Sequence, residues 1–186
     1  MLLPLSRFGI STAAAEGPPR TIADLMHLLA QVVESRSTFT EVKTIAALTV
    51  PLYASGELLY RRPDYLEKVT EQPRPERMVV EGDRLTISTA SEPSREIDLA
   101  SQEMIRGLVD AIRGTLAGKL ALLQQNYRVE MHGDLTGWRL TLTPTDPAVK
   151  LAVSQITIEG IQDSLRFIHT VQANGDESRM TISRVS

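Results

Sequence analysis

The sequence predicts an α+β protein in which a strongly curved, unclosed antiparallel β-barrel is covered by a helical lid. Three observations lead to this prediction. The chain follows the order helix, run of strands, helices, run of strands. Its strand-like segments are joined by short turns marked by proline or glycine, which is typical of antiparallel sheets. Roughly ten short strands exceed what a twisted open sheet carries comfortably, so we expect the sheet to curl and the helices to cover its concave apolar face.

Residues 1–20 are expected to form an N-terminal tail ahead of a single domain over residues 21–186. The small residues Ala13–Ala15 fit the cleavage pattern of an export signal. Arg7 interrupts the apolar run before them, which is too short for a complete signal. The tail is therefore either disordered or the remnant of a signal. No other stretch is apolar for long enough to span a bilayer.

The domain opens with an amphipathic helix predicted over residues 21–34. Thr21 is its expected N-cap, and Asp24 lies three residues later, where a capping box requires an acceptor. Strand-like residues begin at Ser37, and Pro51 interrupts them before a strand that ends at Arg62. Further strands are expected over residues 65–70, 76–81, 85–89 and 95–99.

A second helical region starts near Ser101, where apolar residues form one stripe as far as Leu123. Glycines within it reduce helix propensity, so a single helix and two shorter helices with a turn near Gly114 both fit the pattern. Strands then return, and Asn174-Gly175-Asp176 between the last two is a strong hairpin signal. Their expected ranges are 127–132, 138–143, 151–159, 164–172 and 178–184.

The composition limits the class of function. A net charge of -3 without any lysine- or arginine-rich run disfavours nucleic-acid binding. The absence of cysteine excludes disulfides, thiolate metal sites and cysteine nucleophiles. The three histidines are widely spaced, and no phosphate-binding glycine loop, nucleophile elbow or zinc-protease motif occurs. We therefore expect no metal, no cofactor and no enzymatic activity, and favour a monomeric binding protein.

The candidate site lies between Ser55 and Leu85. The strand face that holds Leu58 and Tyr60 ends on Arg62, and a charge there is costly unless a group in the fold or a ligand pairs with it. Orphan carbonyl groups at the C-terminal end of a neighbouring helix could accept hydrogen bonds from this guanidinium. Arg62 is therefore a candidate latch for the lid. Alternatively, its stem follows the apolar surface and its head group points into solvent.

The same stretch resembles the signature region of the periplasmic outer-membrane lipoprotein carrier family, LolA. Upstream of it, the strand TFTEVK resembles an F-x-Q strand of the family, with Glu41 in place of the glutamine. Lys68 stands where the family commonly has an inward aromatic residue, and a lysine is better suited to a cavity rim or an anionic head group. The matching positions are Gly56, Leu58, Arg62, Pro63, Gln72, Pro73, Val79, Val80, Gly82, Leu85 and Ile87.

The resemblance implies an unclosed barrel with a hydrophobic cavity, whose lid is bonded to Arg62 and opens when acyl chains bind. It also implies a periplasmic carrier that takes lipoprotein acyl chains from an inner-membrane exporter to an outer-membrane acceptor. We expect the cavity to be lined by Phe39, Leu58, Tyr60, Leu66, Val80, Ile87, Trp138 and Leu140, facing Leu25, Leu108 and Ile112 of the lid helices.

The sequence leaves open both the identity of the cargo and the choice between two functions. Because of Lys68, the cargo could also be another lipid, a glycolipid or an acylated metabolite. The alternative function is a lipid-sensing or envelope-stress interaction module on the same scaffold, which is also non-enzymatic.

Overall fold

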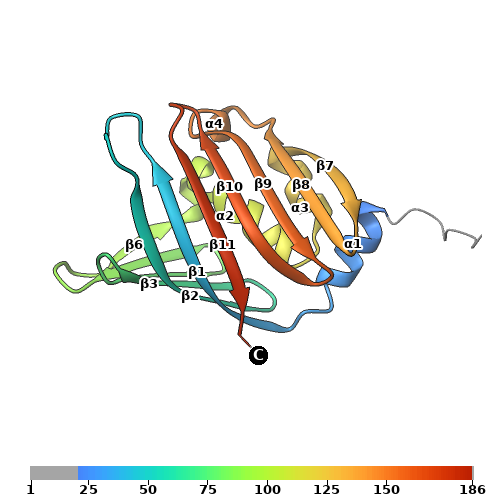
Figure 1. The fold of residues 1–186 in the computed structure, drawn as a ribbon, viewed down its shortest axis with the longest axis horizontal. Coiled ribbons are helices and arrows are strands. Elements are labelled where there is room, and N and C mark those ends of the chain that lie inside the picture. The colour runs from blue at the N-terminus through green and yellow to red at the C-terminus, as the bar shows by residue number, and fades with distance from the viewer. Residues whose placement is uncertain (1–20, 186) are drawn as a thin grey trace, which may run out of the picture.

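The structure, a computed structural model, describes residues 21–185, so the predicted tail over residues 1–20 lies outside it. Figure 1 shows the elements in their spatial arrangement. In chain order they are α1 (Ile22–Leu29), β1 (Glu34–Thr44), β2 (Leu52–Arg61), β3 (Tyr65–Gln72), β4 (Glu76–Glu81), β5 (Arg84–Thr89), β6 (Arg95–Asp98), η1 (Leu99–Ser101), α2 (Glu103–Leu116), α3 (Leu120–Asn126), β7 (Tyr127–Asp134), β8 (Gly137–Pro144), α4 (Pro147–Lys150), β9 (Val153–Ile161), β10 (Ser164–Gln172) and β11 (Glu177–Arg184).

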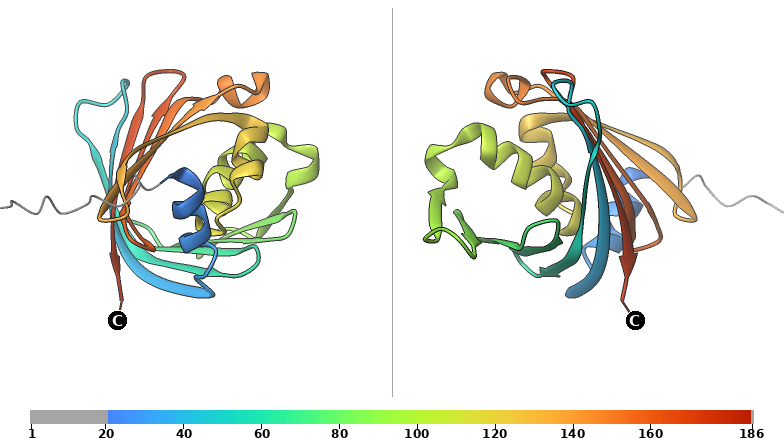
Figure 2. Two further views of the ribbon diagram at one scale, coloured as in Figure 1. Left: turned by 90° about the vertical axis from the view of Figure 1, so that its right-hand side faces the viewer. Right: turned by 60° about the vertical axis from the view of Figure 1, so that its left-hand side comes forward.

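The eleven strands form one antiparallel sheet that curls without closing (Figure 2). Their order across the sheet is β6-β5-β4-β3-β2-β1-β11-β10-β9-β8-β7. The two halves of the chain therefore meet at β1, which pairs with β2 on one side and with β11 on the other. This confirms the curved, unclosed barrel predicted from the sequence.

The helices lie on the concave side of the sheet because of the way the chain connects its edges. β6 and β7 are the two edge strands, and η1, α2 and α3 join one to the other. In Figure 2 this helical segment lies inside the curl, together with α1. The helical lid predicted from the sequence is therefore present. Within the described residues, no helix is long and apolar enough to cross a membrane.

The first helix begins at the predicted capping box and ends earlier than predicted. The Asp24 amide donates to Thr21 Oγ1 at 3.3 Å, and the Thr21 amide donates to Asp24 Oδ2 at 2.7 Å. The helix stops at Leu29 because the chain turns into the sheet, where the Val33 carbonyl accepts a hydrogen bond from the Arg62 amide at 2.9 Å.

The second helical region forms two helices, and the break falls at Gly118 rather than at Gly114. Gly118 has a φ of +63°, the left-handed conformation typical of a residue just after a helix. A Cβ at this position would lie 2.0 Å from the Met26 carbonyl oxygen, so the corner between α2 and α3 packs directly on α1. The short helix α4 was not predicted, although Asp146 caps it by accepting from the Ala148 amide at 2.8 Å.

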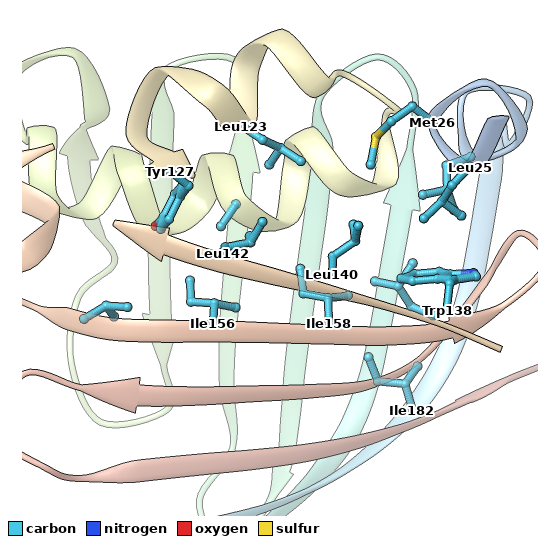
Figure 3. Close-up of a cluster of buried hydrophobic side chains, with 14 of the residues drawn as sticks. Leu25, Met26, Leu123, Tyr127, Trp138, Leu140, Leu142, Ile156, Ile158 and Ile182 are labelled. Atoms are coloured by element: carbon cyan, nitrogen blue, oxygen red, sulfur yellow. The ribbon is translucent and has the colours of Figure 1, made fainter. Parts of the chain in front are cut away.

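Buried apolar side chains form two clusters between the sheet and the helices. Figure 3 shows the larger one, which we call the main core. The smaller cluster, Val80, Leu85 and Leu99, lies where β4, β5 and η1 meet. The main core comprises Leu25, Met26, Leu29, Ala111, Leu123, Tyr127, Trp138, Leu140, Leu142, Val149, Val153, Ile156, Ile158, Leu165 and Ile182.

Gly118→Ala should destabilise the protein by about 3 kcal/mol, because the new methyl group meets the α1 backbone as well as adopting a left-handed conformation. Gly82→Ala is the matched control, since Gly82 has a φ of +58° and open space around the Cβ position. It should lose only about 1 kcal/mol. Urea unfolding of both variants tests this, and equal losses would show that the corner between α2 and α3 does not depend on close packing against α1.

Candidate ligand-binding cavity

A cavity of about 500 Å³ lies between the central strands and α2. One wall is a row of side chains that face one another across four neighbouring strands: Tyr60 opposes Leu66, Leu66 opposes Val80, and Val80 opposes Leu85. The opposite wall is the apolar side of α2. The apolar lining residues are Leu29, Val32, Leu58, Leu59, Tyr60, Leu66, Met78, Val80, Leu85, Ile105, Leu108, Val109, Ile112, Leu116, Ile156, Leu165, Ile168, Met180 and Ile182.

Six of the predicted site residues border this cavity. Four of them, which come from the sheet, are Leu58, Tyr60, Leu66 and Val80. The other two, Leu108 and Ile112, come from α2, the helix that covers the cavity. Their role in binding a ligand stays a prediction.

The other five predicted residues do not line the cavity. Leu25, Trp138 and Leu140 belong to the main core, where Figure 3 shows them packed against one another and their neighbours. Phe39 is buried beneath the ammonium group of Lys68, which lies 4.7 Å from the centre of its ring. Ile87 packs against the smaller cluster. Strand spacing indicates which face each residue is on, but it does not indicate where along that face a helix packs.

Trp138 shows how side chains fill part of the concave side and leave no cavity there. Its indole Nε1 donates to the Gln162 carbonyl at 2.9 Å. The residue opposite it in the sheet is Gly160, where a Cβ would lie 2.2 Å from the Trp138 ring. The absence of a side chain at Gly160 thus makes room for the indole, and the two residues fill this end of the sheet.

Arg62 contacts the end of α1. Its guanidinium Nη1 donates to the carbonyl oxygen of Ala30 at 2.7 Å, and Ala30 is the C-cap of α1. The side chain is otherwise exposed. Of the two arrangements that the sequence left open for Arg62, the structure has the contact between the guanidinium and a carbonyl at a helix end. The role of Arg62 as a latch stays a prediction.

Sequence reasoning assigned Lys68 to a cavity rim or an anionic head group, but it did not identify the polar cluster to which Lys68 belongs. We call this part of the cavity wall the Glu41 cluster, and it consists of Glu41, Lys43, Lys68 and Ser178. All four side chains line the cavity. Lys68 Nζ lies 2.7 Å from Glu41 Oε2, Ser178 Oγ donates to Glu41 Oε1 at 2.6 Å, and Lys43 Nζ lies 3.7 Å from Glu41 Oε1. Glu41 is only 5% exposed. Glu41 and Lys68 are separated by β2, so no local spacing pattern connects them.

The electrostatics of the cluster keep Glu41 ionised. Burial alone would raise the pKa of Glu41. The ammonium groups of Lys68 and Lys43 and the hydrogen bonds from Lys68 and Ser178 outweigh burial and hold that pKa below its usual value of 4.5. The cavity wall therefore carries ionised groups at neutral pH. Among residues 21–185, no group of three or more His, Asp or Glu side chains is placed to hold a metal ion.

Comparison with known proteins gives one family and a set of similar folds. The sequence matches the family described as outer membrane lipoprotein carrier protein LolA-like over residues 15–185. No curated protein sequence matches this chain. A DUF1329 family protein from Desulfovibrio piger has a similar structure with a TM-score of 0.50 at 12% identity, covering 87% of this chain and 88% of the other. A LolA superfamily protein from Nitrosomonas europaea gives 0.48 at 12% identity, covering 88% and 91%.

Glu41→Gln should lower stability at pH 7 by about 1–2 kcal/mol, because it removes a charge-assisted hydrogen bond from a buried cluster. A carboxyl whose pKa is lower in the folded than in the unfolded chain contributes stability that is present above the unfolded value, here 4.5, and lost as the pH falls. The gap between wild type and variant should therefore narrow below pH 4.5 in urea titrations. Glu57→Gln, at an exposed position of β2, is the control. A gap that stays constant down to pH 3 would show that Glu41 is not held ionised by its neighbours.

Proposed function

We propose that this chain, which belongs to the LolA-like family of outer membrane lipoprotein carrier proteins, binds an acyl chain of a lipid or lipoprotein beneath α2 and carries it across the periplasm. The observation that carries the proposal is the apolar cavity of about 500 Å³. Folded interiors are close-packed and hold few voids larger than a water molecule. A cavity of this volume with an apolar lining is instead in the range of small-molecule sites.

The volume of the cavity corresponds to that of one acyl chain. At about 30 Å³ per methylene, close to the share of a water molecule in the liquid, it has room for roughly 12 to 16 carbons. Each methylene that leaves water contributes about 0.8 kcal/mol, so a chain of this length binds without any specific polar contact. Handover to a membrane or to another carrier replaces one apolar environment by another. No covalent step is required at any stage.

In this proposal the helices move away from the sheet to widen the cavity when a chain enters. α2 is fastened to the hairpin between β4 and β5 through Arg113, whose Nη1 donates to the Gly82 carbonyl at 2.6 Å while Asp110 binds the same guanidinium at 2.7 Å. This pair is buried, so it breaks only at a high cost. The contact between Arg62 and Ala30 is exposed and therefore breaks more easily. We assign Arg62 the role of a latch that holds α1 closed over the Leu29 end of the cavity.

Leu108→Trp should reduce acyl-chain uptake at least about tenfold, because the indole occupies volume that the chain needs. Met104→Trp, on an exposed position of the same helix, should bind like the wild type. Native mass spectrometry of each protein after incubation with palmitate measures uptake, and exchange with vesicles measures release. Equal loss in both variants, or no uptake by the wild type, would contradict the proposal. Palmitate that binds and never exchanges would fit the sensing module instead.

Arg62→Leu should speed the release of bound palmitate to vesicles by about fivefold, the effect of losing one exposed charged hydrogen bond. The neighbouring variant Arg61→Leu loses an ion pair with Glu34 and leaves α1 untouched, so its release rate should match the wild type. Stopped-flow transfer measures both rates. If Arg62→Leu and Arg61→Leu release palmitate equally fast, Arg62 is not a latch.

A further inference from the structure

The Glu41 cluster brings three charged side chains together on a cavity wall that is mainly apolar. It contains two ammonium groups, from Lys43 and Lys68, and one carboxylate, from Glu41. The cluster therefore carries one surplus positive charge. A charge beside low-dielectric walls acts more strongly than the same charge in water. The surplus therefore favours an anion inside the cavity.

The hydrogen-bonding capacity of the cluster also favours an anion. Both oxygens of Glu41 are engaged, one by Lys68 and one by Ser178, so the carboxylate offers little to a cationic ligand. The donors of Lys43 are uncommitted among the described residues, since its Nζ lies 3.7 Å from Glu41 Oε1, beyond hydrogen-bonding distance. Lys68 has three donors and gives one to Glu41. The groups left over are donors with positive charge.

The other charged residues on the cavity wall are already neutralised. Glu67 accepts from Arg77 at 2.7 Å and from the Tyr65 hydroxyl at 2.7 Å. Asp163 accepts from Arg184 at 3.1 Å. Neither carboxylate cancels the surplus charge of the Glu41 cluster, so the cluster sets the local sign of the potential.

The cluster lies between solvent and the apolar part of the cavity. Exposure falls from 45% at Lys43 through 24% at Lys68 to 5% at Glu41, so the cluster runs from the rim inward. Apolar side chains adjoin it directly, because Leu58 is opposite Lys68 and Met180 is opposite Glu41 in the sheet. A ligand that is charged at one end and apolar along the rest of its length matches this arrangement.

We propose that the cavity takes an amphiphile with an anionic head group, phosphate or carboxylate, held by Lys43 and Lys68 while its acyl chain lies along the neighbouring apolar wall. This inference rests on the proposed function, which it narrows to one class of cargo. The head group accepts from the donors of Lys43 and Lys68 that Glu41 does not use, and it does not replace the ion pair between Glu41 and Lys68.

The test compares two ligands with the same chain and different head groups. Dodecyl phosphate is anionic and 1-dodecanoylglycerol is uncharged, and isothermal titration below their micellar concentrations gives both affinities. We expect dodecyl phosphate to bind about tenfold more tightly, the effect of charge-assisted hydrogen bonds in a partly buried site. Inorganic phosphate alone is the third ligand, and it should bind at least a hundredfold more weakly than dodecyl phosphate because it lacks the chain.

Variants of the cluster should change the affinity for dodecyl phosphate and leave the affinity for 1-dodecanoylglycerol unchanged. Lys43→Met, at a position whose side chain is 45% exposed, should weaken dodecyl phosphate binding about fivefold and leave 1-dodecanoylglycerol binding unchanged. Glu41→Gln removes the negative charge and should tighten dodecyl phosphate binding by a similar factor. Lys119→Met, exposed at the start of α3 and outside the cavity lining, is the control.

The results distinguish a failure of the head-group site from a failure of acyl-chain binding. If both dodecyl ligands bind equally and no cluster variant changes either affinity, acyl binding stands and the head-group site is refuted. If neither ligand binds, the proposed function fails, and the inference fails with it. If inorganic phosphate binds as tightly as dodecyl phosphate, the cluster is a free-anion site and the amphiphile assignment is wrong.

Discussion

The structure depends on one topological constraint, which is that a single helical segment must join the two opposite edges of a curled sheet. β6 and β7 are the edge strands, and the chain between them crosses the concave side. Because α2 is part of this crossing, its apolar side must face the sheet. The buried pair of Asp110 and Arg113, bonded to the Gly82 carbonyl, fixes α2 to the hairpin between β4 and β5. The space between sheet and helix is thereby enclosed on two sides.

The concave side is divided into a solid part and a hollow part, and this division is what makes the fold suited to a ligand. Under α1 and α3, large side chains such as Trp138 and Leu142 fill the space down to the helices (Figure 3). In front of β2, β3 and β4, side chains of the size of Leu66 and Val80 leave the cavity open.

Much of the fold could be predicted from the sequence, because local patterns determine it. Alternation along strands, the capping box at Thr21 and the hairpin at Gly175 are read within a few residues. The contact of Arg62 with the end of α1 followed from the cost of an unpaired charge and from family resemblance. Position along the concave face was not predictable in this way. Trp138 and Leu140 lie on the expected face but in its solid part, and the ion pair of Glu41 with Lys68 depends on the register of three strands.

In the proposed function, an acyl chain occupies the cavity between the sheet and α2. Methyl NMR spectra recorded with palmitate carrying a nitroxide label midway along its chain test this, since the label broadens signals close to it. We expect strong broadening of the methyl signals of Leu66, Val80 and Ile112, and little change at Leu140 and Leu142 in the main core. Broadening confined to exposed methyl groups, such as those of Leu48 and Val50, would contradict it, because the chain would then bind at the surface.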